Sequence, residues 1–201
     1  MDYMERKSTI DKDLIKKVLG GDSSAFETII SNTKGLVIQI IYKMVKNPED
    51  RKDLVQEVYL KVYDKLESFK FNAKLSTWIG TITYNTCLNY LKKKKIPILD
   101  IDQNEEKEVW ERISIHTFCY SDNQTESYIF KKERSQILTL AIEKLPPLYK
   151  TLIMLYHNEE LSYSEIKEIT GLPEGTVKNY LYRARKKLKE NLSLHYKKEE
   201  L

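Results

Sequence analysis

The chain has 201 residues, of which 41% are hydrophobic and 32% are charged, and its formal net charge is +4. This much apolar material excludes an intrinsically disordered chain, and only 6 Gly and 5 Pro leave too few turn residues for a many-stranded sandwich or barrel. We therefore expect an all-α protein built from long helices.

No stretch of the sequence approaches the ~18 apolar residues that a membrane-spanning helix requires. No apolar run follows the charged first residues, so we also expect no secretory signal. Cys87 and Cys119 lie too far apart in the sequence to indicate a disulfide framework or a metal site, and this usage is typical of a reducing compartment. These observations predict a cytoplasmic protein without membrane insertion.

The charges are distributed unevenly along the chain. Residues 1–95 carry 18 basic and 12 acidic side chains, residues 96–133 carry 4 and 9, and residues 134–201 carry 12 and 9. The middle segment is rich in Asp, Glu, Asn and Ser and lacks a sustained helical period. We predict two small helical domains, 1–95 and 134–201, joined by an acidic flexible linker over 96–133.

Three helices are predicted in the first part of the N-terminal domain. A short helix begins at Asp13 and is stopped by Gly20 and Gly21. A second helix with a long buried stripe follows, until Asn47 and Pro48 end it. Asn47 is a good N-cap for the third helix, which Pro48 opens and whose first turn is acidic.

The third helix carries polar and charged side chains on the face opposite its buried stripe. This face holds Asp53, Gln56, Glu57 and Lys61. Spacing alone leaves two interpretations open, a solvated face and a protein interface.

A fourth helix is predicted from Thr77 to about Leu91, with Ser76 as its N-cap and a run of lysines at 92–95. It is rich in Thr, Asn and Tyr, and because β-branched Thr is a mediocre helix former, we interpret the helix as a surface that contacts a polar partner. Aromatic, short polar and basic side chains together fit single-stranded nucleic acid. Core packing of Trp78 and simple capping by the lysines are the alternative.

The C-terminal domain contains the most specific motif. Ser162 and Glu165 form a capping box, a short helix follows, Gly171 supplies a tight turn, and Pro173 starts a second helix. This order of elements is the signature of a helix-turn-helix.

The outer face of the second helix of this motif is rich in groups that contact DNA. Side chains near its N-terminus suit base edges in a major groove, and the arginines and lysines further along suit phosphates. The alternative is an ordinary helical hairpin with a solvated basic face. The face comprises Glu174, Gly175, Lys178, Asn179, Tyr182, Arg183, Arg185 and Lys186.

Together the two domains resemble bacterial RNA polymerase sigma factors, and their short arrangement is similar to the extracytoplasmic-function (ECF) subfamily. The sequence DLVQEVY at 53–59 is similar to the core-binding motif of the family. Residues 71–91, with TWI at 77–79, resemble its promoter-melting and −10 segment, and GTVK at 175–178 with YRAR at 182–185 resembles its −35-reading domain. The resemblance implies a sigma region 2-like helical bundle and a sigma region 4-like helix-turn-helix domain.

The resemblance assigns roles to individual residues. It places binding of core polymerase on Asp53, Gln56, Glu57 and Lys61. It places −10 recognition on Asn72, Lys74, Trp78, Asn85, Asn89, Lys92, Lys93 and Lys94, with Asn72 reading an extruded base. It places −35 recognition on Glu174, Gly175, Thr176, Lys178, Asn179, Tyr182, Arg183, Arg185 and Lys186.

One residue departs from the family pattern. Lys167 stands where a small residue usually packs between the two helices of the motif. Either its aliphatic stem runs along the helix interface or the two helices cross at a different angle.

The resemblance implies a factor that directs core RNA polymerase to promoters and assists strand opening. The implied partners are the β′ and β subunits of the polymerase, promoter DNA and, as for many members of the family, an anti-sigma factor, and no cofactor or metal is implied. The main alternative is a stand-alone regulator that binds duplex DNA without polymerase.

An enzyme is the third interpretation of the sequence. His116, Cys119 and His157 are its nucleophile or metal candidates, but two of them lie in the predicted linker. The sequence also has no Gly-rich phosphate loop, so we expect no catalysis.

Overall fold

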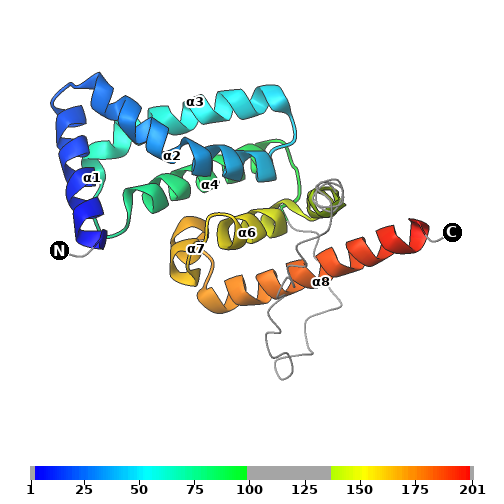
Figure 1. Ribbon diagram of the computed structural model, residues 1–201. Helices are drawn as coiled ribbons and strands as arrows, with labels where there is room; N and C mark the ends of the chain where they lie inside the picture. The colour runs from blue at the N-terminus through cyan, green and yellow to red at the C-terminus, as the bar shows by residue number, and fades with distance from the viewer. Residues whose placement is uncertain (1–2, 99–136, 200–201) are drawn as a thin grey trace, which may run out of the picture.

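The computed structural model describes residues 3–98 and 137–199, and every regular element in these ranges is helical (Figure 1). The all-α prediction is therefore confirmed for the described residues. Most of the predicted linker, with His116 and Cys119, lies outside them. None of the described helices is long and apolar enough to cross a bilayer. The elements are α1 (Tyr3–Leu19), α2 (Ser23–Met44), α3 (Pro48–Lys65), η1 (Leu66–Ser68), α4 (Leu75–Lys93), α6 (Pro147–His157), α7 (Tyr163–Thr170) and α8 (Glu174–Glu199), with a further helical segment at 137–143.

A tight turn capped by Asp22 joins α1 to α2. The Asp22 carboxylate accepts hydrogen bonds from the backbone N–H groups of Ser24 (2.9 Å) and Ala25 (3.3 Å), which have no partner within the helix. Gly21 precedes it with a φ of 92°, a conformation that favours Gly. The predicted start of the first helix at Asp13 is wrong, because α1 begins at Tyr3: residues 4–7 are good helix formers although they supply no apolar stripe.

The start of α3 is as predicted. The side chain of Asn47 accepts hydrogen bonds from the backbone N–H groups of Glu49 (2.9 Å) and Asp50 (3.3 Å), with Pro48 in the first turn. Arg51 then ties α3 back to the end of α2, since its Nε donates to the carbonyl of Val45 at 2.7 Å.

The start of α4 differs from the prediction. The N-cap is Lys74, whose side chain makes no capping hydrogen bond, and the helix begins at Leu75. Ser76 therefore lies inside the first turn, and its predicted role as the cap is wrong. Leu75 is only 4% exposed, so burial of this side chain favours a helix that starts before the better capping residue.

The threonines of α4 are mostly core residues. Thr77, Thr83 and Thr86 are at most 3% exposed, and the Thr83 hydroxyl donates to the carbonyl of Ile79 at 2.8 Å. Such a bond within the helix satisfies the hydroxyl, so the small β-branched side chain packs as an apolar one. The interpretation of these threonines as a polar contact surface is therefore wrong.

The helix-turn-helix is formed as predicted, except that α8 begins at Glu174, one residue after Pro173. The Ser162 hydroxyl accepts the Glu165 N–H (3.3 Å), and the Glu165 carboxylate accepts the Ser162 N–H (2.9 Å), which completes the capping box of α7. Gly171 ends α7 with a φ of 72°.

The N-terminal and C-terminal helices pack against each other, with α6 on α2 and α7 on α4 (Figure 1). Ile40 and Ile79 from the first half share one hydrophobic cluster with Leu152 and Ile169 from the second, and all four are at most 1% exposed. The sequence leaves the relative placement of the two halves open. The structure shows a closed arrangement with a continuous core.

Candidate nucleic-acid and protein interfaces

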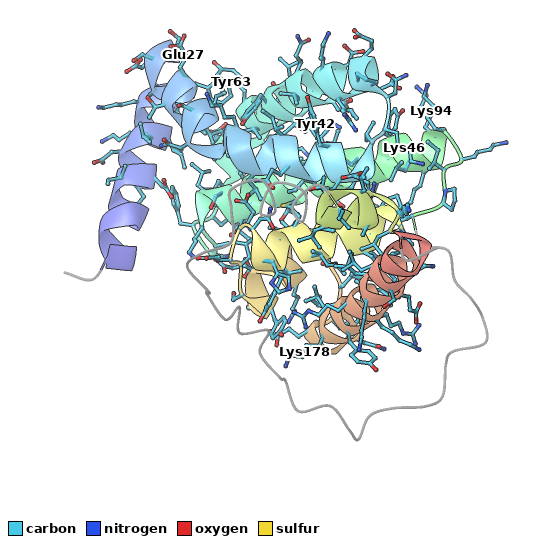
Figure 2. The ribbon with its side chains drawn as sticks, turned by 45° about the vertical axis from the view of Figure 1, so that its right-hand side comes forward. Glu27, Tyr42, Lys46, Tyr63, Lys94 and Lys178 are labelled. Carbon is cyan, nitrogen blue, oxygen red and sulfur yellow. The ribbon has the colours of Figure 1, made fainter. Side chains whose placement is uncertain are left out.

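α8 turns one side to the core and the other to solvent. Val177, Leu181 and Ala184 form the buried side and are at most 1% exposed. The residues predicted to contact the −35 element lie away from this stripe, and Lys178 projects from the N-terminal half of the helix (Figure 2). Gly175, Lys178, Tyr182, Arg185 and Lys186 are exposed, whereas Glu174, Thr176, Asn179 and Arg183 are partly buried.

Lys167, the residue that departs from the family pattern, does not fill the interface between α7 and α8. Its side chain is exposed, and Ile166 and Ile169 supply the buried face of α7 at 0% and 1% exposed. The unusual lysine is therefore accommodated at the surface.

Two stacked tyrosines, Tyr156 and Tyr163, lie beside the cations of α8. Their ring centroids are 5.1 Å apart with 15° between the planes. Lys178 Nζ lies 5.1 Å from the centroid of Tyr163, and the Arg185 guanidinium lies 5.3 Å from that of Tyr156. Cation–π attraction therefore holds two of the predicted DNA-contacting cations against one aromatic support.

His157 supports the same arginine. Arg185 Nη2 lies 3.2 Å from His157 Nε2, and because a guanidinium can only donate, the imidazole nitrogen is the acceptor. Burial and the neighbouring Arg185 lower the pKa of His157 from its usual 6.5, which favours this neutral form. The structure thus places one of the candidate catalytic residues in a contact with the face of α8.

The residues predicted for −10 recognition are spread along α4 and the loop before it. Asn72 lies before α4 and the lysines lie at its end, so the ~28 Å length of this helix separates them. Lys74 and Trp78 are partly buried: Lys74 Nζ lies 2.7 Å from Glu165 Oε1, and Trp78 packs on Phe69 with centroids 5.1 Å apart. The exposed members are Asn72, Asn85, Asn89, Lys92, Lys93 and Lys94.

The loop before α4 exposes an aromatic ring that was not among the site residues predicted from the sequence. Phe71 is 40% exposed and adopts a φ of 57°, which is uncommon for a residue with a side chain. Its ring lies against Phe69 at 4.8 Å and below Lys12 Nζ at 5.5 Å. The signal in the sequence is the aromatic pair that flanks Lys70, immediately before the predicted base-reading Asn72.

The polar face of α3 also contains an apolar residue. Asp53, Gln56 and Glu57 are exposed as predicted, whereas Lys61 is partly buried and contacts Glu57 Oε1 (2.5 Å) and Thr86 Oγ1 (3.2 Å). Leu60 is 65% exposed and follows Gln56 by one helical turn. Leu60 was not among the residues predicted from the sequence, although its spacing places it on the face that holds Asp53 and Gln56.

Burial keeps the Cys87 thiol in its protonated form. Cys87 is fully buried, and burial, with a smaller effect of Glu57, raises the pKa of its thiol to about 12, so the thiolate that would act as a nucleophile is suppressed. Within residues 3–98 and 137–199, no group of three or more His, Cys, Asp or Glu side chains is arranged to hold a metal ion.

Residues 29–96 match the family model for Sigma-70 region 2, and residues 135–188 match that for Sigma-70, region 4. The chain is 34% identical over 182 residues to the ECF RNA polymerase sigma factor SigW of Bacillus subtilis (strain 168). The aligned residues cover 90% of this chain and 96% of SigW. This chain belongs to the ECF sigma factor family. It is also 31% identical over 177 residues to the ECF RNA polymerase sigma-E factor of Escherichia coli (strain K12), covering 87% of this chain and 90% of that factor.

Solved structures share the fold of this sigma factor. CnrH, in complex with the cytosolic domain of CnrY, matches with a TM-score of 0.61 and 17% identity, over 92% of this chain and 98% of that chain. The sigma factor RpoE from Bartonella quintana, in complex with the anti-sigma factor NepR, matches with a TM-score of 0.58 and 23% identity. This match covers 84% of this chain and 96% of that chain.

Family membership explains the order of the surfaces along the chain. The region 2 match contains the polar face of α3 and the residues predicted for −10 recognition, and the region 4 match contains those predicted for −35 recognition. The roles of the individual residues in this sigma factor stay predictions.

Proposed function

We propose that this sigma factor binds core RNA polymerase, directs it to promoters through their −35 and −10 elements, and assists strand opening. The observation that carries the proposal is the relationship to ECF sigma factors over both regions, in order, across 90% of the chain. The stand-alone regulator is less favoured, because a helix-turn-helix alone leaves the region 2 match unexplained.

The −35 element is contacted by the N-terminal half of α8. A helix fits the ~12 Å major groove, and Lys178 and Asn179 offer a donor for guanine and a bidentate amide for adenine. Arg183, Arg185 and Lys186, one to two turns later, contact phosphates and fix the register of the helix.

The −10 element is contacted by α4 and the loop before it. Extruding a base costs a few kcal/mol, and stacking on an aromatic ring returns about 1–3 kcal/mol per base. The exposed ring of Phe71 next to Asn72 offers such a stacking partner together with an amide to read the base. The exposed Lys92, Lys93 and Lys94 then neutralise the backbone of the separated strand.

Core polymerase is bound by the polar face of α3. An apolar residue surrounded by polar ones is the usual anatomy of a protein interface, and Leu60 is an exposed apolar residue on the face of Asp53, Gln56 and Glu57. The two acids give this face a charge that selects a basic partner surface.

The proposed activity is binding in the cytoplasm without catalysis, since the polymerase supplies the chemistry of RNA synthesis. An anti-sigma factor is a further proposed partner, because the structurally similar RpoE binds one.

Reversing two charges on the polar face of α3 tests whether this face binds core polymerase. The double variant D53K/E57K is expected to lose at least tenfold in affinity for purified core polymerase, because like charges across an interface cost several kcal/mol. Affinity is measured by titration with labelled factor, and circular dichroism checks that the helix content is unchanged. The matched control D13K/E27K reverses two exposed acids elsewhere, Glu27 lying at the start of α2 (Figure 2), and should bind normally. Equal loss in both variants would contradict the assignment.

Footprinting separates the sigma factor from the stand-alone regulator. We expect protection of a promoter only when both the chain and core polymerase are present. Specific protection by the purified chain alone would favour the regulator.

A further inference from the structure

A cation from α1 lies over the exposed ring of Phe71, in the loop before α4. Lys12 belongs to α1, and its Nζ lies 5.5 Å from the centroid of this ring. The residues matched to region 2 begin at position 29, so the family model covers no part of α1. A cation within about 6 Å of a ring centroid is attracted to the face of the ring. A helix outside the region 2 match therefore brings a positive charge to the loop that the proposed function assigns to the −10 element.

The ammonium group of Lys12 can accept an anion as a partner. The side chain is exposed, and among the residues that the structure describes no carboxylate pairs with it. Lys74, by contrast, lies 2.7 Å from Glu165 Oε1. An ammonium group carries three N–H donors, and the contact with the ring leaves them to water or to an anion.

Phe71 and Lys12 lie on elements that are held in place. Phe69 is 7% exposed, and its ring contacts those of Phe71 at 4.8 Å and Trp78 at 5.1 Å. The φ of 57° at Phe71 is a conformation that persists only when the surrounding structure determines it. α1 also packs on η1, which ends at Ser68, immediately before this aromatic group. The ring and the ammonium group are therefore positioned before any DNA binds.

A nucleotide that stacks on Phe71 would present its phosphates close to Lys12. Proteins that bind single strands combine aromatic rings, on which bases stack, with cations that follow the phosphate backbone. The proposed function places the extruded −10 base on Phe71, next to Asn72. The flexible four-carbon stem of a lysine lets its ammonium group move from the ring to a neighbouring phosphate while the helix stays in place. The ring and the ammonium group thus fit two parts of one nucleotide.

We propose that Lys12 binds a backbone phosphate beside the extruded −10 base, so that α1 is part of the promoter-binding surface of this sigma factor. The proposal rests on the proposed function, which supplies the separated strand. Phe71 stacks on the base and Asn72 reads it, whereas Lys12 contacts a group that every nucleotide carries. Lys12 therefore adds affinity and fixes the position of the strand without adding sequence preference.

Neutralising Lys12 tests the phosphate contact. Affinity is measured between holoenzyme that contains the full chain and a labelled non-template oligonucleotide over the −10 element of a promoter mapped by footprinting. One phosphate contact to a single strand contributes about 0.7 to the slope of log affinity against log salt concentration. Lys12→Gln is therefore expected to reduce this slope by about 0.7, and to weaken binding about eightfold at 50 mM salt with no loss at 1 M. Lys12→Arg keeps the charge and should keep the slope.

Lys17 supplies the matched control. It is an exposed lysine of the same helix, and its charge interacts with that of Asp22 in the turn that follows α1. Lys17→Gln removes the same charge from the chain and should leave the slope unchanged, while circular dichroism checks that both variants keep their helix content. An equal fall of the slope in both variants would reflect net charge alone and would overturn the assignment to Lys12.

A change in the oligonucleotide locates the phosphate. The phosphates that flank the extruded base are replaced one at a time by an uncharged methylphosphonate. At one of them the unmodified factor is expected to lose several-fold in affinity, and the Lys12→Gln variant should lose nothing further, because its contact is already absent. If every replacement weakens the two proteins equally, Lys12 contacts none of these phosphates and the proposal is wrong.

Phe71→Leu separates a phosphate contact from simple support of the ring. This variant loses the stacking surface, so it should bind more weakly with an unchanged salt slope. If Lys12 only supported the ring, Lys12→Gln would also leave the slope unchanged and would add no loss to that of Phe71→Leu, and this result would contradict the proposal. If the unmodified holoenzyme does not bind the oligonucleotide at all, the proposed function fails instead, so the two failures are distinguishable.

Discussion

At the scale of single residues, Tyr156 is the sharpest test of how the α8 cations are held. Its ring lies under Arg185 and stacks on Tyr163. Removing it by Tyr156→Leu forfeits a cation–π contact of about 0.5–1 kcal/mol, so affinity of the holoenzyme for a duplex −35 element should fall about two- to fivefold. Tyr156→Phe keeps the ring and should bind normally. Equal loss in both variants would show that the hydroxyl group, rather than the aromatic face, matters.

His157 gives the fold a pH dependence. Because burial and Arg185 lower its pKa below 6.5 in the folded chain, the unfolded chain binds more protons between these two values. The free energy of unfolding contributed by this site is therefore fully present above pH 6.5 and falls as the pH is lowered through the folded pKa. Urea unfolding at pH 7.5 and 5.5 should show this loss, and His157→Gln should reduce it. If His157→Gln loses as much unfolding free energy between pH 7.5 and 5.5 as the unmodified chain, other groups cause the pH dependence.

The exposure of polar side chains was easier to predict from the sequence than the exposure of apolar ones. Helical spacing was sufficient to place Asp53, Gln56 and Lys178 in solvent, because one buried stripe determines the opposite face. Leu60 and Phe71 were missed because an apolar residue is expected to be buried, and only the packed structure shows that they are exposed.

At the scale of elements, Ser162 anchors the helix-turn-helix. Its hydroxyl and backbone N–H both pair with Glu165 in the capping box. Ser162→Ala should lower the free energy of unfolding by about 1 kcal/mol, measured by urea denaturation of the full chain. Ser164→Ala, an exposed position inside α7, is the matched control and should be neutral or slightly stabilising. If both changes cost the same, the capping box contributes nothing.

Helix ends were predictable where a local hydrogen bond determines them. Asn47, Ser162 and Gly171 act through groups two to four residues away, which a sequence displays directly. Ser76 failed as a cap because burial of Leu75 decides where α4 begins, and the threonines of α4 were misassigned because their burial depends on other helices. Tertiary packing overrode a correct local preference in both cases.

At the scale of the whole molecule, ion pairs join the two halves, although the small net charge gives no sign of them. Lys43 pairs with Glu143, and Lys74 pairs with Glu165, across 100 and 91 positions of the sequence. Periodicity reports only neighbours along a helix, so it predicts both halves without predicting that they touch. Some of the positive and negative charges are therefore paired within the molecule, where acids of one half neutralise lysines of the other.

Reconstituted run-off transcription tests the central claim most directly. Purified core polymerase, the full chain and a library of genomic fragments from the source of the chain are combined, with a known sigma factor as the control for active core. The account predicts discrete transcripts that require both the chain and core, and that share sequence elements near −35 and −10. Active core that yields no transcript with the folded chain, together with no measurable binding between the two, would contradict it.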